Sequence, residues 1–217
     1  TGDWSSDVCS SDLRHIVGYT LLGAILAFVA IFLFTRDVEM PKNQAMPWQS
    51  YINENQQTVV FNLTMAESRL IDAARQFGTE INASLFESEL EKPELEVYFS
   101  STKVGGISAR IILNLILDEQ IIESLSNNID ESMQMPSGVK NTTFTSAGER
   151  SMSRLKIKSL TFIPGANLDK EVIENLFGKP ARVELATEGV SYWHYPQKGL
   201  RIIVDREQKE VLEFFNQ

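Results

Sequence analysis

Hydrophobic residues are distributed unevenly along the chain, with one long apolar run near its start. This run begins at Ile16, ends at Phe34 and contains no charge, no amide side chain and no proline over its nineteen residues. A helix rises 1.5 Å per residue, so the run covers roughly 28 Å, close to the ~30 Å hydrocarbon core of a bilayer. The pattern predicts a transmembrane helix over residues 14–35, with the lipid bilayer as its partner.

The run has the features of a permanent anchor. A cleaved secretory signal has a shorter apolar core and then a cleavage site of small residues, whereas here four large apolar residues and then Arg36 follow Ala30 closely. Residues 36–57 contain two prolines and many amides without an apolar period. They predict a tether between the membrane and a folded part.

Shorter periodic patterns predict an α+β domain over residues 58–163. Residues 58–63 are β-branched and aromatic, which favours a strand. The capping-box pattern of residues 64–67 is typical of a helix start, and Gly78 suits the end of that helix. A further helical turn is expected over residues 81–86.

Glycines and polar caps divide the rest of this domain. Gly105 and Gly106 suit a two-residue hairpin turn between alternating apolar positions, and Asp118 suits the cap of another helix. A strand is expected over residues 139–145, and a longer one follows whose alternation shifts near Lys158, as a bulge requires. The order strand, helix, strand, strand, helix, strand is that of a split βαβ, ferredoxin-like unit.

Residues 164–217 predict a second lobe, a helix followed by an antiparallel β-meander. Asn167 is placed to cap the helix and Gly178 to end it. Four short strands separated by turns then follow, at residues 182–186, 190–195, 200–204 and 210–215. The helix residues expected to face inward are Leu168, Val172, Leu176 and Phe177.

The C-terminal lobe resembles the small BamE-like (SmpA/OmlA) modules of bacterial envelope proteins. A helix ends in Leu-Phe-Gly-Lys-Pro, and a strand, a Trp-x-Tyr motif and a Gly-led strand ending in an acid follow. The matching residues are Leu176, Phe177, Gly178, Lys179, Pro180, Trp193, Tyr195, Gly199, Leu200 and Asp205. The resemblance covers at most a quarter of the chain. It implies a helical layer on an antiparallel sheet, an envelope location and a scaffolding role without catalytic residues.

The chain departs from that family in its anchor and in its helices. Members are usually lipoproteins held by a cysteine, whereas this chain has an apolar helix, and a single helix precedes its meander. Long C-terminal domains cross the membrane largely regardless of flanking charge. Together with the resemblance, this predicts a single-pass protein of the cell inner membrane with its C-terminal part in the periplasm.

The first thirteen residues are set apart because they resemble a translated sequencing adaptor. Residues 3–12 can be back-translated into such a string, so residues 1–13 are interpreted as an artefact of sequence assembly. The single cysteine, Cys9, lies there, so no disulfide, thiol nucleophile or thiolate metal site is expected in the rest. Leaving out the three aspartates of this segment changes the formal net charge from −9 to −6. The acidic balance argues against nucleic acid as a partner.

No arrangement of residues predicts catalysis, a cofactor or a metal. The histidines are His15, next to the predicted span, and His194, in the middle of a predicted strand without a nucleophile elbow. One histidine without cysteines is a poor zinc site. The acids between Glu87 and Glu96 surround Pro93 and are interpreted as a solvated connection. The chain is therefore expected not to be an enzyme.

Strand alternation separates two groups of side chains near the C-terminus. Trp193 and Tyr195 share one face and are expected to pack on the helix, while Tyr192 and His194 share the other, with Arg201 near them. Aromatic residues and arginine are common anchors of interfaces. Tyr192, His194 and Arg201 are therefore predicted to form a partner-binding surface.

Two functions remain open from the sequence. The first is a membrane-anchored periplasmic protein with a non-catalytic binding or scaffolding role towards an envelope protein. The alternative is a ligand-sensing periplasmic domain that binds a small molecule or peptide between its two lobes.

Overall fold

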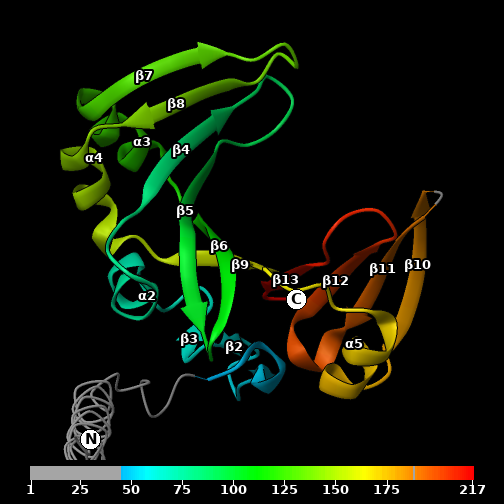
Figure 1. Cartoon of the computed structure of the whole chain (residues 1–217). Helices are drawn as coiled ribbons and strands as arrows, with labels where there is room; N and C mark the ends of the chain where they lie inside the picture. The colour runs from blue at the N-terminus through cyan, green and yellow to red at the C-terminus, as the bar shows by residue number, and fades with distance from the viewer. Residues whose placement is uncertain (1–44, 188) are drawn as a thin grey trace, which may run out of the picture. The chain divides into compact units, whose positions relative to one another are not determined.

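The computed structural model describes residues 45–187 and 189–217 (Figure 1). The predicted artefact, the predicted transmembrane helix and most of the predicted tether lie outside the described residues. Among the helices that the structure does describe, none combines the length and the hydrophobicity needed to cross a membrane. The residues from 45 onward belong to one compact unit.

A large antiparallel sheet organises this unit, which confirms the α+β class. Its ten strands lie in the order β10-β11-β12-β13-β9-β6-β5-β4-β8-β7, and every neighbouring pair is antiparallel. The strands are β4 (Asn82–Glu87), β5 (Glu94–Val104), β6 (Ile107–Leu115), β7 (Ile129–Gln134), β8 (Lys140–Phe144), β9 (Ile157–Pro164), β10 (Arg182–Thr187), β11 (Val190–Tyr195), β12 (Leu200–Asp205) and β13 (Val211–Phe215).

A separate three-stranded sheet precedes the large one. It contains β1 (Tyr51–Ile52), β2 (Thr58–Val60) and β3 (Leu63–Thr64), and a short turn of helix, Pro47–Gln49, comes before it. The chain bends between β2 and β3 because Phe61 and Asn62 both have positive φ. The strand predicted at residues 58–63 therefore lies outside the large sheet, and the strand order is not that of the ferredoxin-like unit.

Four α-helices are present among the described residues: α2 (Leu70–Phe77), α3 (Glu119–Leu125), α4 (Ser146–Ser151) and α5 (Lys170–Phe177). The prediction that Asp118 caps a helix is confirmed, because its side chain accepts a hydrogen bond from Ile121 N at 2.8 Å. The predicted capping box at residues 64–67 is wrong. The chain first crosses to β9, where Ala66 N donates to Ile157 O, and α2 begins only at Leu70.

Two further local predictions, the helical turn at residues 81–86 and the cap of α5, are wrong. Residues 81–86 were expected to be helical, but they lie in β4, where Ala83 and Leu85 alternate inward against the core. The cap of α5 is Asp169 rather than Asn167, since Asp169 Oδ1 accepts from Val172 N at 2.9 Å.

The predicted hairpin and bulge are both confirmed. Gly105 and Gly106, with φ of 56° and 84°, form the turn between β5 and β6. In the pairing of β6 with β9, Ser159 lies opposite Asn114 and Ile157 lies opposite Leu115, so Lys158 is the extra residue. The shift lets Ile157 and Leu160 both point into the core.

The predicted helix and β-meander are also present in residues 164–217. Strands β10 to β13 follow one another in the sheet, and α5 packs on them through the buried Ile173 and Phe177. The expectation that Val172 faces inward is wrong, because its side chain is 36% exposed. The inward stripe of α5 is set one residue later, at Ile173.

The two regions predicted as separate lobes share one sheet. Strand β9, from the first region, pairs with β13, from the second, with Phe162 opposite Leu212 and Leu160 opposite Phe214. Figure 1 shows β9 in yellow and β13 in red between the green strands and the orange strands. We call this pairing the seam.

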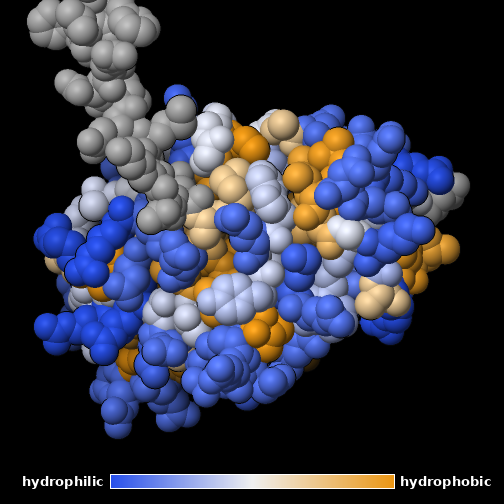
Figure 2. All heavy atoms as spheres, turned by 90° about the horizontal axis from the view of Figure 1, so that it is seen from below, coloured by the Kyte–Doolittle hydropathy of each residue, from blue (hydrophilic) through white to orange (hydrophobic). Residues whose placement is uncertain are grey.

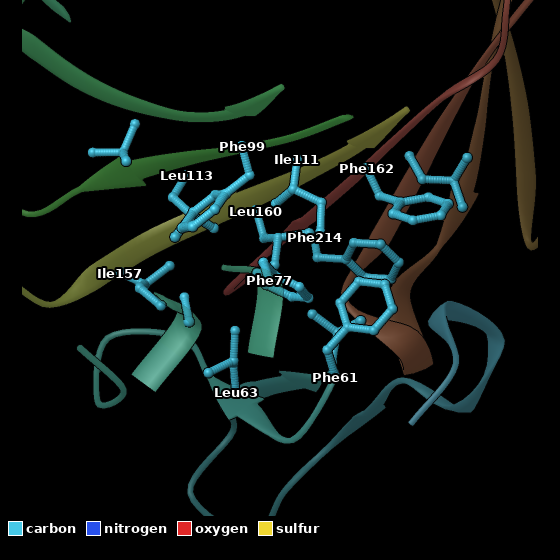
Figure 3. Packing of buried hydrophobic residues seen from close by; sticks show 14 of the residues in the cluster. Phe61, Leu63, Phe77, Phe99, Ile111, Leu113, Ile157, Leu160, Phe162 and Phe214 are labelled. Carbon is cyan, nitrogen blue, oxygen red and sulfur yellow. The ribbon is translucent and has the colours of Figure 1, made fainter. Parts of the chain in front are cut away.

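The hydrophobic core lies on one face of the sheet, and Phe61, in the turn between β2 and β3, packs against it from the side of the small sheet (Figure 3). The Phe61 ring centroid lies 5.5 Å from that of Phe162, 5.6 Å from that of Phe77 and 6.4 Å from that of Phe214. The turn between β2 and β3 thus links the seam to α2. The small sheet and α2 cover this side, and we call it the covered face.

Candidate binding face

The opposite side of the sheet carries partly exposed polar and aromatic side chains. Strand register places one row of residues straight across six strands, because each member lies opposite the next. We call the face of this row the open face. The row is Ile112, Thr161, Glu213, Arg201, His194 and Arg182.

The neighbouring row, one residue along on five of these six strands, is buried instead. It lies on the covered face, and its members are between 0% and 5% exposed. This row is Leu113, Leu160, Phe214, Leu200 and Tyr195. The sequence predicts that Trp193 and Tyr195 share one face and that Tyr192 and His194 share the other. This prediction is confirmed: the first pair lies on the covered face and the second pair on the open face.

The structure brings the three predicted partner-surface residues together on the open face. His194 lies directly opposite Arg201 on neighbouring strands. The Arg201 guanidinium carbon lies 5.2 Å from the centroid of the Tyr192 ring and 5.7 Å from that of Phe215. Both distances suit a cation–π contact. Phe215 was not predicted, because the pairing of β12 with β13 was needed to place it here.

Glu213 fixes the position of this arginine. Its Oε2 atom lies 2.6 Å from Arg201 Nε and 2.6 Å from Arg201 Nη2, so a single oxygen accepts from two donors. A guanidinium group has five N–H donors. Arg201 is thus held in one orientation between two rings, and part of its donor edge remains for a partner. We call Tyr192, Arg201, Glu213 and Phe215 the arginine cluster.

His194 belongs to a neighbouring group of charges on the edge side of the open face. Glu184 Oε2 lies 3.0 Å from Arg182 Nη2 and 3.4 Å from His194 Nε2, and Arg182 Nη2 lies 3.3 Å from His194 Nε2. All three side chains reach solvent. The imidazole of His194 is thus positioned by the carboxylate of Glu184 and the guanidinium group of Arg182, in an arrangement suited to polar recognition.

A hollow of about 580 Å³ opens on the open face at the seam. Arg201, Glu213 and Phe215 line it from one region, and Asn114 and Lys158 line it from the other. Asn114 Oδ1 is buried and has no hydrogen-bond partner among the described residues. Asn114 thus adds this buried oxygen to the residues that line the hollow, and a buried oxygen without a partner carries an uncompensated desolvation cost.

A larger groove of about 900 Å³ lies elsewhere, between α2, the start of β4 and α4. Leu70 and Ala74 of α2 line it together with Glu149 and Arg150 of α4. Ile71 of α2 is 40% exposed and lines this groove. The groove was not predicted because α4 was not: its sequence has no apolar period, and Thr145 Oγ1 initiates it by accepting from Gly148 N.

Two tyrosines, one on each face, hold their protons more tightly than usual. Burial raises the pKa of Tyr195 to about 12, and the charge of Glu174 adds to the effect. The Tyr195 hydroxyl donates to Gly178 O at 3.1 Å. Burial also raises the pKa of Tyr98, and its hydrogen bond to Glu96 raises it further. Both hydroxyls therefore act as hydrogen-bond donors and stay neutral near pH 7.

No group of three or more metal-ligating side chains comes together within residues 45–187 and 189–217. Comparison of the chain with protein-family models, with curated proteins and with solved structures finds no match. Functional inference therefore rests on the geometry of the open face.

Proposed function

We propose that this chain is a single-pass inner-membrane protein whose periplasmic part binds another envelope protein and catalyses no reaction. The uncharged run between Ile16 and Phe34 supports the anchor. The resemblance of the C-terminal lobe to BamE-like modules supports the envelope location and the scaffolding role.

The observation that carries the proposal is the arginine cluster on the open face. Interface hot spots are enriched in tyrosine, tryptophan and arginine. Here an arginine is already ordered by two rings and a carboxylate before any partner arrives. Ordering a side chain in advance removes part of the entropic cost of binding. The fully buried apolar residues of the same strands lie on the covered face, and the charged side chains of the open face remain accessible to a partner.

Site-specific photocrosslinking in cells tests the binding role. A photoreactive amino acid replaces Tyr192 or His194 on the open face, and a matched probe replaces Leu90, which is 95% exposed in the acidic connection. We expect one dominant adduct with an envelope protein from the two open-face probes and a much weaker one from Leu90. Equal adducts from all three positions, or none from the open face, would contradict the proposal.

The membrane orientation has its own test. A reporter that is active only outside the cytoplasm and one that is active only inside are each fused after Gln217. We expect activity of the periplasmic reporter alone, and loss of membrane association when residues 16–34 are deleted. Activity of the cytoplasmic reporter alone would exclude the periplasmic role.

A second candidate function is binding of a small molecule or peptide in the hollow at the seam, between the two predicted lobes. The unpartnered Asn114 Oδ1 favours it. A ligand that binds the folded state raises the melting temperature by mass action. We expect a hit among envelope metabolites or short peptides to stabilise the native chain but not Asn114→Val. Equal stabilisation of both would place the ligand elsewhere.

A further inference from the structure

Strand β10 ends the large sheet and leaves one of its edges without a partner strand among the described residues. Its side chains are unusually exposed for a strand: Val183 is 50% exposed and Leu185 is 83% exposed. An edge strand presents unpaired N–H and C=O groups that can template another strand. In Figure 2, a view from below, hydrophobic residues reach the surface in separate patches between hydrophilic ones.

The opposite edge of the sheet, β7, is protected by charge. Asp130 and Glu131 are adjacent on this strand, and all six of its residues are exposed. Acidic side chains on an edge discourage a second strand from pairing there. Strand β10 lacks such protection, because its charged residues Arg182 and Glu184 have opposite signs.

The order of residues on β10 is complementary to itself. In an antiparallel pair formed by two copies around a two-fold axis, an axis at Val183 places Val183 opposite Val183 of the second copy. The same axis places Arg182 of each copy opposite Glu184 of the other copy, so two pairs of opposite charges form. Opposite charges facing each other across strands stabilise the pair, and like charges destabilise it.

We propose that β10 pairs antiparallel with β10 of a second copy of this chain, with the two-fold axis at Val183. Two ten-stranded sheets then join into one, and the edge is removed. An axis at Arg182 would face two arginines, and an axis at Glu184 would face two glutamates. The proposed register avoids both of these like-charge contacts and brings Leu185 opposite Ala181 of the second copy. Arg182 and Glu184, which are exposed and 3.0 Å apart within one copy, each gain a second opposite charge from the other copy.

Cysteine crosslinking of the full chain in detergent tests the register. The background variant is Cys9→Ser, so each protein has a single introduced cysteine. Residues directly opposite each other have Cα atoms about 4.5–5.5 Å apart, within the range of a disulfide. We expect Val183→Cys to form a covalent dimer with a mild oxidant. Leu185→Cys should not, because four residues separate its two copies, roughly 13 Å.

A charge exchange tests the pairing without a covalent bond. Arg182→Glu faces acid with acid twice, and we expect dimerisation to weaken roughly tenfold. Glu184→Arg should have a similar effect. The double variant Arg182→Glu with Glu184→Arg restores both opposite-charge pairs and should restore the dimer. The fold should be unaffected, because exposed pairs contribute little to stability; far-ultraviolet circular dichroism checks it.

Several outcomes would overturn the proposal. One is a monomer at all concentrations by light scattering with no crosslink from Val183→Cys. A crosslink from Leu185→Cys in place of Val183→Cys would exclude the register. A ladder of larger oligomers would mean that β10 pairs with a different edge, and failure of the double variant to recover would exclude the facing charges. Arg182 and Glu184 also position His194 on the open face, so the results of the charge variants are interpreted together with the crosslinks. Val183 and Leu185 lie on the other side of β10, and their crosslinks report the dimer independently of the envelope partner.

Discussion

The two faces of the sheet are made by the same strands but carry opposite kinds of side chains. Phe214 is 0% exposed on the covered face, where its ring lies near that of Phe61. The next residue, Phe215, is partly exposed on the open face, where its ring lies against Arg201. One phenylalanine packs in the core, and the other contacts an arginine side chain on the open face. Residue type alone therefore does not assign a role; the strand position does.

The largest loss of stability should come from Phe214→Ala, and Phe215→Ala is the variant to compare with it. Phe214→Ala leaves a cavity at the centre of the seam and should lower the free energy of unfolding by about 3–5 kcal/mol. Phe215→Ala should lower it by about 1 kcal/mol or less, because its ring already reaches water. Urea unfolding followed by circular dichroism measures both. Equal losses would mean that the open face is covered in solution.

A second comparison uses two glycines that both have positive φ. An added Cβ at Gly199 would overlap the buried Thr58 hydroxyl and methyl group, whereas one at Gly106 meets nothing within 4 Å. Gly106→Ala should lower the free energy of unfolding by about 1–2 kcal/mol through backbone strain alone. Gly199→Ala should lower it by a further 1–3 kcal/mol, roughly, through overpacking. Thermal unfolding of the two variants compares the effects, and similar values would indicate that the small sheet is not docked at Gly199.

The hydroxyl of Tyr195 gives a pH-dependent test of the covered face. Tyr195→Phe removes its hydrogen bond to Gly178 and should lower the free energy of unfolding by about 1 kcal/mol near pH 7.

The pKa of this tyrosine is about 12 in the folded chain and about 10 when unfolded. Its neutral form thus contributes stability that is complete below pH 10 and lost as the pH rises to 12. The native chain should lose more stability than Tyr195→Phe between urea unfolding at pH 9 and pH 11. The same slope in both proteins would exclude this linkage.

The smallest effect on stability, with the greatest effect on binding, should come from Arg201→Ala. A partly exposed ion pair and its ring contacts contribute about 1 kcal/mol or less to folding. The photocrosslink from Tyr192 should nevertheless be lost. Lys140→Ala, which breaks an exposed ion pair with Glu87 far along the sheet, is the matched control and should retain the crosslink. Retention of the adduct in Arg201→Ala would remove the arginine cluster from the binding role.

Local features of the fold could be predicted from sequence where a few neighbouring residues determine them. Gly105 and Gly106 determine a turn that needs positive φ at both positions. Asp118 determines a helix start through its own hydrogen bond. The phase shift at Lys158 marks a bulge because alternation has a period of two.

Features that depend on distant residues could not be predicted in this way. The strand β7 has no apolar alternation, since no residue of it is buried. Strand β4 has a short pattern that fits a helix or a strand, and only its neighbours β5 and β8 decide. The same limit applies to the binding face. Alternation predicted that Tyr192 and His194 share one face, with Arg201 near them. Glu213 and Phe215 reach this face only through the pairing of β12 with β13, and Asn114 only through the pairing of β6 with β9 and the seam.

The seam also has a consequence for how the chain is made. Strand β13 lies in the interior of the sheet, between β12 and β9, although it is the last strand in the sequence. Strands β12 and β9 stay unpaired along one edge until Val211–Phe215 has been synthesised. Non-local pairing of this kind is slow, and unpaired strands are prone to aggregate. A chain that ends just before β13 loses only residues 211–217. It should nevertheless depend on chaperones far more than this small loss of length suggests.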